Sequence, residues 1–195
     1  MAEKPKPRQR KSRPRKSRPR LPGDPSAEEL IARIIRVDHA GEYGAVRIYA
    51  GQLRVLGETP SARPVREMAE AEAQHLETFE RLVVERRVRP TALMPIWTLA
   101  GFALGAATAA LGPRATMACA VAVEEVIDEH YTRQIERLGD DEPALARTLR
   151  KFRADEREHR DAGLAHGAEE APGYLPMTTA IKAASRLAIW LSERI

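Results

Sequence analysis

The chain has 195 residues, 43% of them hydrophobic and 31% charged, a balance that indicates one globular domain with a sizeable core and excludes a wholly disordered protein. Its single cysteine, Cys119, excludes an internal disulfide framework, and it has no Cys or His partner at metal-ligand spacing, so we expect it in the core. The net charge of +4 is unevenly distributed, because residues 1 to 20 hold ten Lys or Arg and one acid, whereas the rest of the chain has 22 basic and 27 acidic residues.

Residues 1 to 24 form a basic tail with frequent proline and almost no apolar side chains, as in Arg18-Pro19-Arg20. Such a segment buries too little apolar surface to offset the entropy of folding, so we predict that the tail is disordered. A basic tail can bind nucleic acid, anionic lipid or no partner at all. Because this one has no interleaved aromatic residues and no nucleic-acid motif, we expect no nucleic-acid partner.

Residues 25 to 195 are predicted to form one all-α domain, since no run of useful length alternates between apolar and polar residues. The first helix begins at Ser26, which is followed three residues later by Glu29, the pattern of a capping box. Pro64 lies near the start of the second helix, where its missing N–H is tolerated. The predicted helices span residues 26–56, 61–87, 90–113, 114–138, 142–167 and 178–194.

The third predicted helix is a run without any charged residue, between Arg89 and Arg114. Its place between two helix hairpins is that of a crossover helix along a bundle. The run is long enough to cross a membrane, but Gly, Ala and Pro95 dilute its larger side chains. We therefore favour a helix that lies in the bilayer interface over one that spans it, with soluble packing against the bundle as the other alternative.

The last predicted helix is amphipathic, because its apolar side chains recur at helical spacing along one face. Trp190 lies close to this stripe. The helix is therefore a second candidate surface for peripheral contact with a membrane. The stripe consists of Ile181, Ala184, Leu187, Ala188, Leu191 and Ile195.

Two copies of one pattern occur in the chain, a lone Glu followed about thirty residues later by Glu-x-x-His. Residues three apart share a helix face, so each Glu-x-x-His presents a carboxylate and an imidazole in the same direction. Turn residues at 57–60 and 139–143 lie midway between each lone Glu and its partner motif, so antiparallel hairpins bring them level. The spacing leaves open whether Glu124 or its neighbour Glu125 is used. The six candidate metal ligands are Glu42, Glu72, His75, Glu124, Glu156 and His159.

In a four-helix bundle these six residues fall in one layer, which predicts a site for two metal ions. Four carboxylates and two neutral imidazoles carry a formal charge of about −4, which two divalent ions cancel. Oxygen and nitrogen donors without thiolate suit iron or manganese better than structural zinc. A solvated helix face explains one copy of the motif alone, but the repetition with matched turns argues against it.

Four stretches of the sequence are distinctive: Arg36 to Gln52, which reads RVDHAGEYGAVRIYAGQ; Arg87 to Pro95; Met117 to Glu125; and the ending Leu191 to Arg194. They closely resemble the demethoxyubiquinone hydroxylase family of ubiquinone biosynthesis, from about residue 30 to the end. The resemblance implies a ferritin-like bundle with two iron ions per chain, a monooxygenase that hydroxylates demethoxyubiquinol with O2. The family's ligand pattern falls on the six candidate residues and favours Glu124 over Glu125.

The same resemblance implies partners and a location. The expected partners are a polyprenyl quinol, O2, an electron donor, other ubiquinone-biosynthesis proteins and a membrane surface. The expected location is peripheral, at the cytoplasmic face of a bacterial membrane or the matrix face of the mitochondrial inner membrane. The alternatives are a ferritin-like protein for iron storage or peroxide handling, and a non-enzymatic membrane protein whose acids are only solvated.

Roles within the ligand set follow as hypotheses. Glu72 and Glu156, in the paired motifs, bridge the two ions, while Glu42 and Glu124 bind at opposite ends.

Several residues around the ligands are candidates for supporting roles. Asp38 and Asp155 are the acids best placed to orient ligands, and Tyr131 is a candidate to line the site. Gly41 and Gly44 flank a ligand inside a helix, where each costs about 1 kcal/mol relative to Ala, which indicates a close neighbour, either substrate or another helix. Three further histidines lack the paired spacing: His39, His130 and His166.

Overall fold

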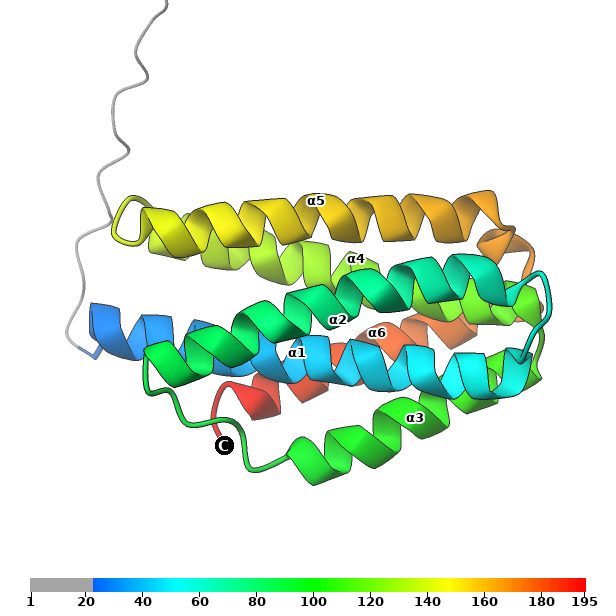
Figure 1. Cartoon of the computed structure of the whole chain (residues 1–195). Helices are drawn as coiled ribbons and strands as arrows, with labels where there is room; N and C mark the ends of the chain where they lie inside the picture. Colours follow the sequence, from blue (N-terminus) through cyan, green and yellow to red (C-terminus); the bar gives the residue numbers. More distant parts are fainter. Residues whose placement is uncertain (1–22) are drawn as a thin grey trace, which may run out of the picture.

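The computed structural model describes residues 23 to 195, and within that range six α-helices and one short 3-10 helix account for all the regular structure (Figure 1). This confirms the predicted all-α fold. The predicted disorder of residues 1 to 24 concerns a segment of which residues 1 to 22 lie outside the described part, and it stays a prediction. The elements are α1 (Ala27–Leu56), α2 (Ala62–Glu85), α3 (Met94–Ala110), α4 (Pro113–Leu138), α5 (Pro143–Ala165), η1 (Ala168–Glu170) and α6 (Tyr174–Ser192).

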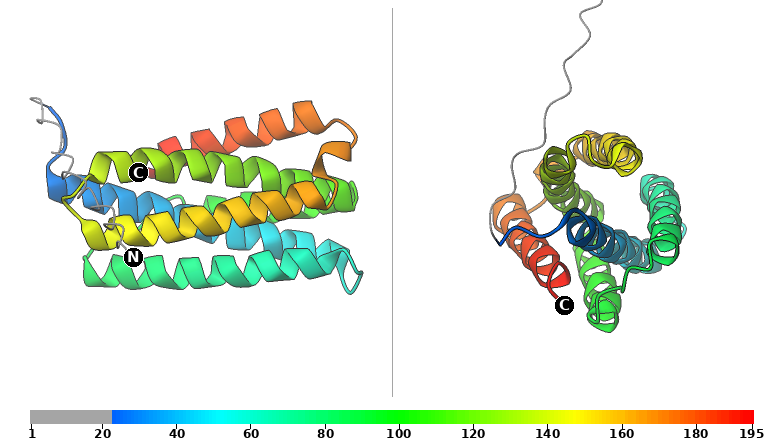
Figure 2. Two further views of the ribbon diagram at one scale, coloured as in Figure 1. Left: turned by 90° about the horizontal axis from the view of Figure 1, so that it is seen from above. Right: turned by 90° about the vertical axis from the view of Figure 1, so that its left-hand side faces the viewer.

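Two antiparallel hairpins, α1 with α2 and α4 with α5, form a four-helix bundle (Figure 1). Helix α3 connects the hairpins and packs along α1, while α6 packs along α4. Viewed along the bundle, α3 and α6 lie on the side of α1 that faces away from α5 (Figure 2). The bundle therefore has one side that is covered by two additional helices.

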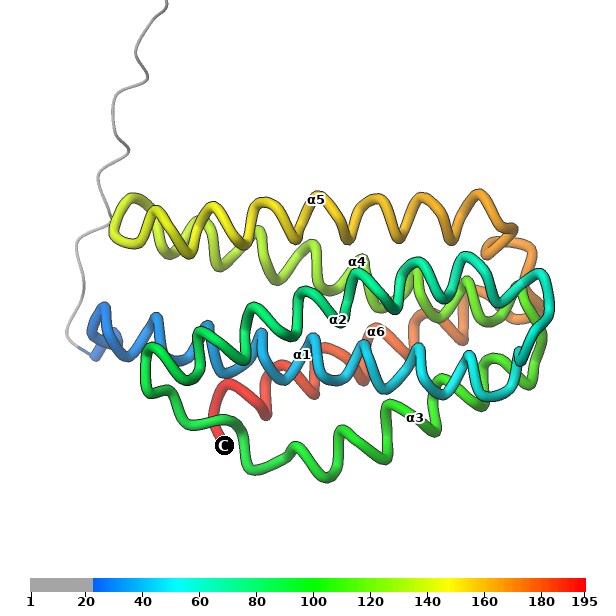
Figure 3. Tube along the Cα trace, in the orientation of Figure 1, coloured from blue at the N-terminus to red at the C-terminus, as the bar shows by residue number. Residues whose placement is uncertain are grey.

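Both hairpin turns lie where the sequence predicts them (Figure 3). Gly57 follows α1 with φ of 59°, and Gly139 follows α4 with φ of 54°, in the left-handed region that favours glycine. At the start of α1, the Ser26 side chain accepts a hydrogen bond from the Glu29 N–H at 3.1 Å. The Glu29 carboxylate accepts from the Ser26 N–H at 2.7 Å, which confirms the capping box.

Two helices, α3 and α6, differ most from their predicted spans, and each has a proline in its first turn. Helix α3 is shorter than the uncharged run that predicts it, and Pro95 lies in its first turn. Helix α6 begins at Tyr174, four residues before the predicted start, directly after the left-handed Gly173. Pro176 lies in the first turn of α6, where its N–H would have no helical acceptor, so it does not delay the start of the helix.

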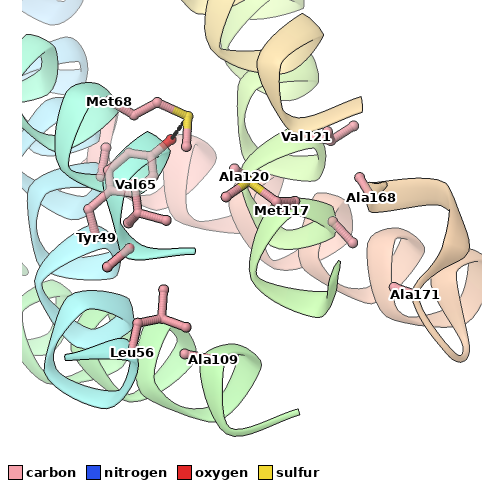
Figure 4. Close-up of a cluster of buried hydrophobic side chains, with 13 residues drawn as sticks. Tyr49, Leu56, Val65, Met68, Ala109, Met117, Ala120, Val121, Ala168 and Ala171 are labelled. Carbon is pink, nitrogen blue, oxygen red and sulfur yellow. Dashed lines mark hydrogen bonds between the residues drawn. The ribbon is translucent and has the colours of Figure 1, made fainter. Parts of the chain in front are cut away.

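Small side chains build much of the core at one end of the bundle, around a few larger ones (Figure 4). Ala62 and Ala118 are fully buried there, and the Tyr49 hydroxyl oxygen lies 3.8 Å from the Met68 sulfur. Cys119 is buried as expected, and burial raises the pKa of its thiol to about 12. The thiol is therefore unreactive at neutral pH.

Glycines allow α3 to approach α1 closely. A Cβ atom at Gly51 would collide with the backbone of Phe102, and one at Gly105 would collide with the backbone of Ile48. The two helices are therefore in backbone contact, which fixes where α3 lies. Among residues 23 to 195, no helix is both long and apolar enough to cross a membrane.

Candidate metal centre

The six side chains predicted as ligands meet inside the bundle. Helices α1 and α4 each provide one glutamate, and α2 and α5 each provide one Glu-x-x-His pair. All six residues are buried. The hairpin geometry explains why these side chains lie close together, because each turn lies midway between a lone glutamate and its Glu-x-x-His pair. The residues are Glu42, Glu72, His75, Glu124, Glu156 and His159.

These residues form two overlapping groups, each able to hold a metal ion. Within each group, one ligand atom per residue lies within 4.8 Å of the others. Glu72 and Glu156 belong to both groups. The first group is Glu42, Glu72, His75 and Glu156, and the second is Glu72, Glu124, Glu156 and His159.

Each shared carboxylate directs one oxygen to each histidine. Glu72 places Oε1 at 3.1 Å from His159 Nδ1 and Oε2 at 3.9 Å from His75 Nδ1. Glu156 places Oε1 at 3.3 Å from His75 Nδ1 and Oε2 at 3.5 Å from His159 Nδ1. Both imidazoles therefore present Nδ1 to the interior of the cluster.

The two lone glutamates are each held by a tyrosine from the opposite hairpin. Tyr131 of α4 donates a hydrogen bond to Oε1 of Glu42, and Tyr49 of α1 donates to Oε1 of Glu124 at 2.6 Å. Burial and the neighbouring carboxylates raise the pKa of both phenols well above 10, so they stay protonated donors. Among the described residues, Oε2 of each glutamate has no hydrogen-bond partner and is free to bind a cation.

Tyr131 lines the site, as the sequence predicts, whereas the sequence-based expectations did not include Tyr49. The signal was present, because each tyrosine follows its own helix's lone glutamate by seven residues, two helical turns along the same face. Recognising it requires knowing that α1 and α4 face each other, so that each tyrosine reaches the other helix's glutamate.

The cluster is electrostatically unfavourable without a cation. Burial raises the pKa of Glu72 and Glu124 well above the usual range, and the charge of Glu156 raises both further. Burial also raises the pKa of Glu156 itself, although the His75 imidazole, whose Nδ1 lies 3.3 Å from Glu156 Oε1, opposes it. Burial alone would lower the pKa of His75, but Glu156 and Glu42 raise it to about 10. The metal-free centre therefore retains protons that cations would displace.

One of the two acids expected to orient a ligand does so. Asp155 Oδ2 lies 3.1 Å from His75 Nε2, the ring nitrogen that points away from the cluster, and Lys151 holds the same oxygen at 2.8 Å. Such a partner fixes the orientation of the ring. Asp38 behaves differently, because its carboxylate accepts a hydrogen bond from Gln134 at 2.7 Å and lies 3.5 Å from His130 Nε2.

The remaining candidates lie apart from the two groups. Glu125 pairs with Lys182 of α6, which leaves Glu124 as the cluster's residue on α4. His39 is buried, which lowers its pKa, and belongs to neither group. His166 places Nδ1 at 2.8 Å from the carbonyl oxygen of Ala162 at the end of α5.

An apolar cavity of about 180 Å³ lies between α1, α3, α4 and α6. Gly41 and Gly44, on either side of Glu42, line it. In the described part of the chain, nothing lies within 4 Å of the point where a Cβ would stand on either glycine. The space on the Cβ side of both glycines therefore belongs to the cavity, while Gly101 of α3 packs close to the Gly44 carbonyl oxygen. Its lining also includes Trp97, Leu104, Ile127 and Ile189.

Comparison with known proteins shows the family to which the chain belongs. The family model for "Ubiquinone biosynthesis protein COQ7" matches residues 29–192. The 3-demethoxyubiquinol 3-hydroxylase of Rhodospirillum rubrum is 56% identical over 177 residues, which cover 90% of this chain and 84% of that protein. The human NADPH-dependent 3-demethoxyubiquinone 3-hydroxylase, mitochondrial, is 53% identical over 169 residues, covering 85% of this chain and 78% of the human protein.

A more distant relative is the 5-demethoxyubiquinone hydroxylase, mitochondrial, of Saccharomyces cerevisiae, at 42% identity over 180 residues, covering 84% of this chain and 77% of the yeast protein. The family match includes all six cluster residues and all six α-helices, apart from residues 27 and 28 at the start of α1. The chain belongs to the COQ7 family of ubiquinone biosynthesis proteins.

Proposed function

We propose that the protein hydroxylates the ring of demethoxyubiquinol with O2 at two iron ions held by the six buried carboxylate and imidazole side chains. Its family and its relatives make it a hydroxylase of ubiquinone biosynthesis. The observation that carries the iron proposal is the pair of overlapping donor groups that share Glu72 and Glu156.

The donor set fits two iron ions. Four carboxylates balance the charge of two divalent cations, and carboxylate with imidazole is a donor set that iron accepts. The cluster atoms without hydrogen-bond partners among the described residues include both oxygens of Glu72 and Glu156 and Nδ1 of His75 and His159. Buried polar atoms are seldom left unpaired, so bound cations account for them. Two reduced iron ions, when bound, supply electrons to O2 so that one oxygen atom enters the quinol ring.

The free oxygens support distinct roles for the four glutamates. Glu72 and Glu156 have both oxygens available and are proposed to bridge the two ions. Glu42 and Glu124 each have one oxygen held by a tyrosine hydroxyl and are proposed to bind one ion each, at opposite ends. The tyrosines fix the direction in which the remaining oxygen points.

The apolar cavity is proposed as the site of the quinol ring. Its walls are almost entirely apolar, which suits a polyprenyl quinol and excludes water from the reaction. Because Gly41 and Gly44 expose bare backbone beside Glu42, a flat ring can approach the ligand-bearing turn of α1 more closely than any side chain there would allow.

We expect Gly44→Val to block this approach. One extra methylene in an apolar pocket changes kcat/KM by about 10- to 200-fold, and since valine adds three carbon atoms we expect a loss at the upper end of this range or above it with a short-chain demethoxyubiquinol. Iron content and the reaction of the reduced protein with O2 in the absence of quinol are the controls, and both should be unchanged, because O2 is small. An unaltered kcat/KM for the quinol would place the ring elsewhere.

We also propose that α3 and α6 hold the protein at a membrane surface. Leu99 of α3 is 74% exposed and Trp190 of α6 is 51% exposed, and the same two helices line the apolar cavity. Each CH2 of the prenyl tail costs about 0.8 kcal/mol to expose to water, so transfer from lipid directly into the cavity is favoured. The basic tail adds attraction to anionic lipid.

The two electrons that each turnover needs are proposed to come from a reduced nicotinamide, because the human relative is named NADPH-dependent. Other ubiquinone-biosynthesis proteins are proposed partners, and the membrane is proposed to be a bacterial membrane at its cytoplasmic face or the mitochondrial inner membrane at its matrix face. Iron storage is not favoured, because the family and the relatives are hydroxylases.

A further inference from the structure

In the described part of the chain, the wall of the apolar cavity contains a serine hydroxyl without a hydrogen-bond partner. Three residues of the lining carry a polar side-chain atom, namely Trp97, Ser185 and Ser192. Trp97 donates from Nε1 to Oγ of Ser192 at 3.1 Å, so these two groups satisfy each other. Ser185, which is half-buried on α6, makes no hydrogen bond to any described residue.

A hydroxyl inside a helix can satisfy itself by bonding to the carbonyl oxygen one turn earlier, and Ser185 does not do so. Thr98 and Thr108 of α3 donate in this way at 2.9 Å, and Thr178 of α6 donates at 2.7 Å. The Ser185 hydroxyl is therefore available to a molecule in the cavity. An entirely apolar occupant would leave it unpaired, which costs free energy.

Ion pairs fix the level of Ser185 along the bundle. Helix α6 runs in the same direction as α4 (Figure 1). Lys182 pairs with Glu125, and Arg186 pairs with Glu129 at 3.1 Å. Each pair joins residues 57 positions apart in the chain. Because Ser185 lies between the two cations on α6, it is level with residue 128 of α4.

Two tyrosine hydrogen bonds relate this level to α1, which is antiparallel to α4. Tyr131 donates to Glu42, and Tyr49 donates to Glu124 at 2.6 Å. Between these two bonds, residue 128 of α4 is level with residue 45 of α1, and residues 44 and 45 both line the cavity. The free hydroxyl therefore lies on the α6 wall of the cavity, at the level of the turn of α1 that follows Glu42.

A para-quinol carries groups that match this arrangement. Its two ring hydroxyls are para to each other, so a ring carbon that bears hydrogen is ortho to one hydroxyl and meta to the other. When that carbon faces the turn of α1 beside Glu42, the meta hydroxyl points away from α1. A hydroxyl both donates and accepts hydrogen bonds, so it can pair with a serine in either direction.

We propose that Ser185 binds the quinol hydroxyl that is meta to the ring carbon to be hydroxylated. The inference rests on the proposed function and deepens it, because it names the group that orients the ring. A flat ring held only by apolar walls can rotate in its own plane. One hydrogen bond from a wall fixes the rotation, and so determines which ring carbon is turned toward Glu42.

The test compares two ligands in two proteins. One ligand is a short-chain demethoxyubiquinol, and the other is the phenol in which hydrogen replaces the meta hydroxyl. Their dissociation constants are measured by calorimetry without O2, on the full chain in its iron-loaded, reduced form. We expect wild type to bind the quinol about tenfold more tightly than the phenol. Ser185→Ala should bind the two ligands about equally, because neither can form the hydrogen bond.

Thr179→Ala is the matched control. Thr179 is exposed on α6 and is not part of the cavity lining, so this variant removes a hydroxyl from the same helix without changing the cavity. It should keep the preference of wild type for the quinol. A general disturbance of α6 would weaken both ligands alike and leave their ratio unchanged. An unchanged ratio in Ser185→Ala, or no preference in wild type, would overturn the inference.

The orientation of the ring has a readout of its own. A ring bound in the wrong rotation lets O2 be consumed without hydroxylation. At saturating quinol, the yield of hydroxylated product per O2 consumed should therefore fall in Ser185→Ala and stay at the wild-type value in Thr179→Ala. An undiminished yield in Ser185→Ala would show that this hydroxyl does not orient the ring.

Failure of this inference and failure of the proposed function would look different. If wild type hydroxylates the quinol while Ser185→Ala keeps the wild-type preference and yield, Ser185 does not bind the ring and the proposed function stands. If wild type does not hydroxylate the quinol, the proposed function fails, and the inference fails with it.

Discussion

Replacing Glu72 by Ala should abolish hydroxylation and remove most of the bound iron. Both oxygens of Glu72 lie among the metal-facing atoms, so its loss takes a ligand from both donor groups at once. Losing a residue that merely supports a ligand costs about 10- to 100-fold in metal affinity or activity, and losing a shared ligand should cost more than 100-fold. Glu156→Ala should behave alike, for the same reason.

The matched control is Glu125→Ala, which removes a glutamate next to Glu124 that pairs with Lys182 instead. Iron per chain, measured by elemental analysis, should stay at about two in this variant. The metal-free Glu72→Ala protein should remain folded, because burial already makes that carboxylate unfavourable. An equal loss of iron from the Glu125 variant would contradict the assignment on α4.

Removing the metal should lower the melting temperature substantially, and more at high pH than at low pH. Ligands present at about 1,000 times their Kd stabilise a protein by about 4 kcal/mol, which corresponds to about 10 °C for a domain of this size. We therefore expect a chelator to lower the midpoint by about this amount or more. The measurement is a thermal melt with and without chelator, at pH 6 and at pH 9.

The pH dependence follows from the shifted pKa values. The folded-state pKa of His75 is about 10, above its usual 6.5, so its contribution to stability is full below pH 6.5 and is lost as pH rises through 10. The pKa values of Glu72 and Glu124 are also raised in the folded, metal-free protein. These carboxyl groups therefore destabilise the metal-free fold increasingly as the pH rises above 4.5, the value for the unfolded chain. Both effects weaken the metal-free protein toward pH 9. If the difference in melting temperature between the metal-bound and the chelator-treated protein became smaller with rising pH, this electrostatic account would be contradicted.

The ligand set could be predicted from the sequence because its geometry is local. A Glu-x-x-His pair shares a helix face wherever the helix lies, and the turns at Gly57 and Gly139 set the level at which each lone glutamate returns. The capping box at Ser26 is local in the same way. Such features need no knowledge of how the hairpins pack against each other.

Features that depend on packing could not be read in this way. Tyr49 reaches Glu124 across the bundle, 75 residues away, and its role appears only once α1 and α4 are placed together. Asp38 was expected to orient a ligand from its spacing to Glu42, but the position of α4 gives it Gln134 and His130 as partners. A single helix face specifies which side chains point together, not which residues of another helix meet them.

The glycines illustrate the same limit. Gly44 and Gly51 look alike in the sequence, since both lie inside α1. In the structure Gly51 is required because the backbone of α3 passes against it, whereas Gly44 faces open space in the apolar cavity. Only the position of α3 separates a glycine that serves packing from one that leaves room for a ligand.

The most direct test of the central claim is a single turnover under isotopically labelled oxygen. Protein loaded with two iron ions per chain is reduced anaerobically, mixed with a short-chain demethoxyubiquinol, and exposed to ¹⁸O₂, and the quinol product is analysed by mass spectrometry. We expect a hydroxylated ring that carries one ¹⁸O atom, in an amount proportional to the iron bound and absent from Glu72→Ala. Unchanged quinol beside accumulating ferric mineral, or product without ¹⁸O, would contradict an oxygen-dependent hydroxylase at this centre.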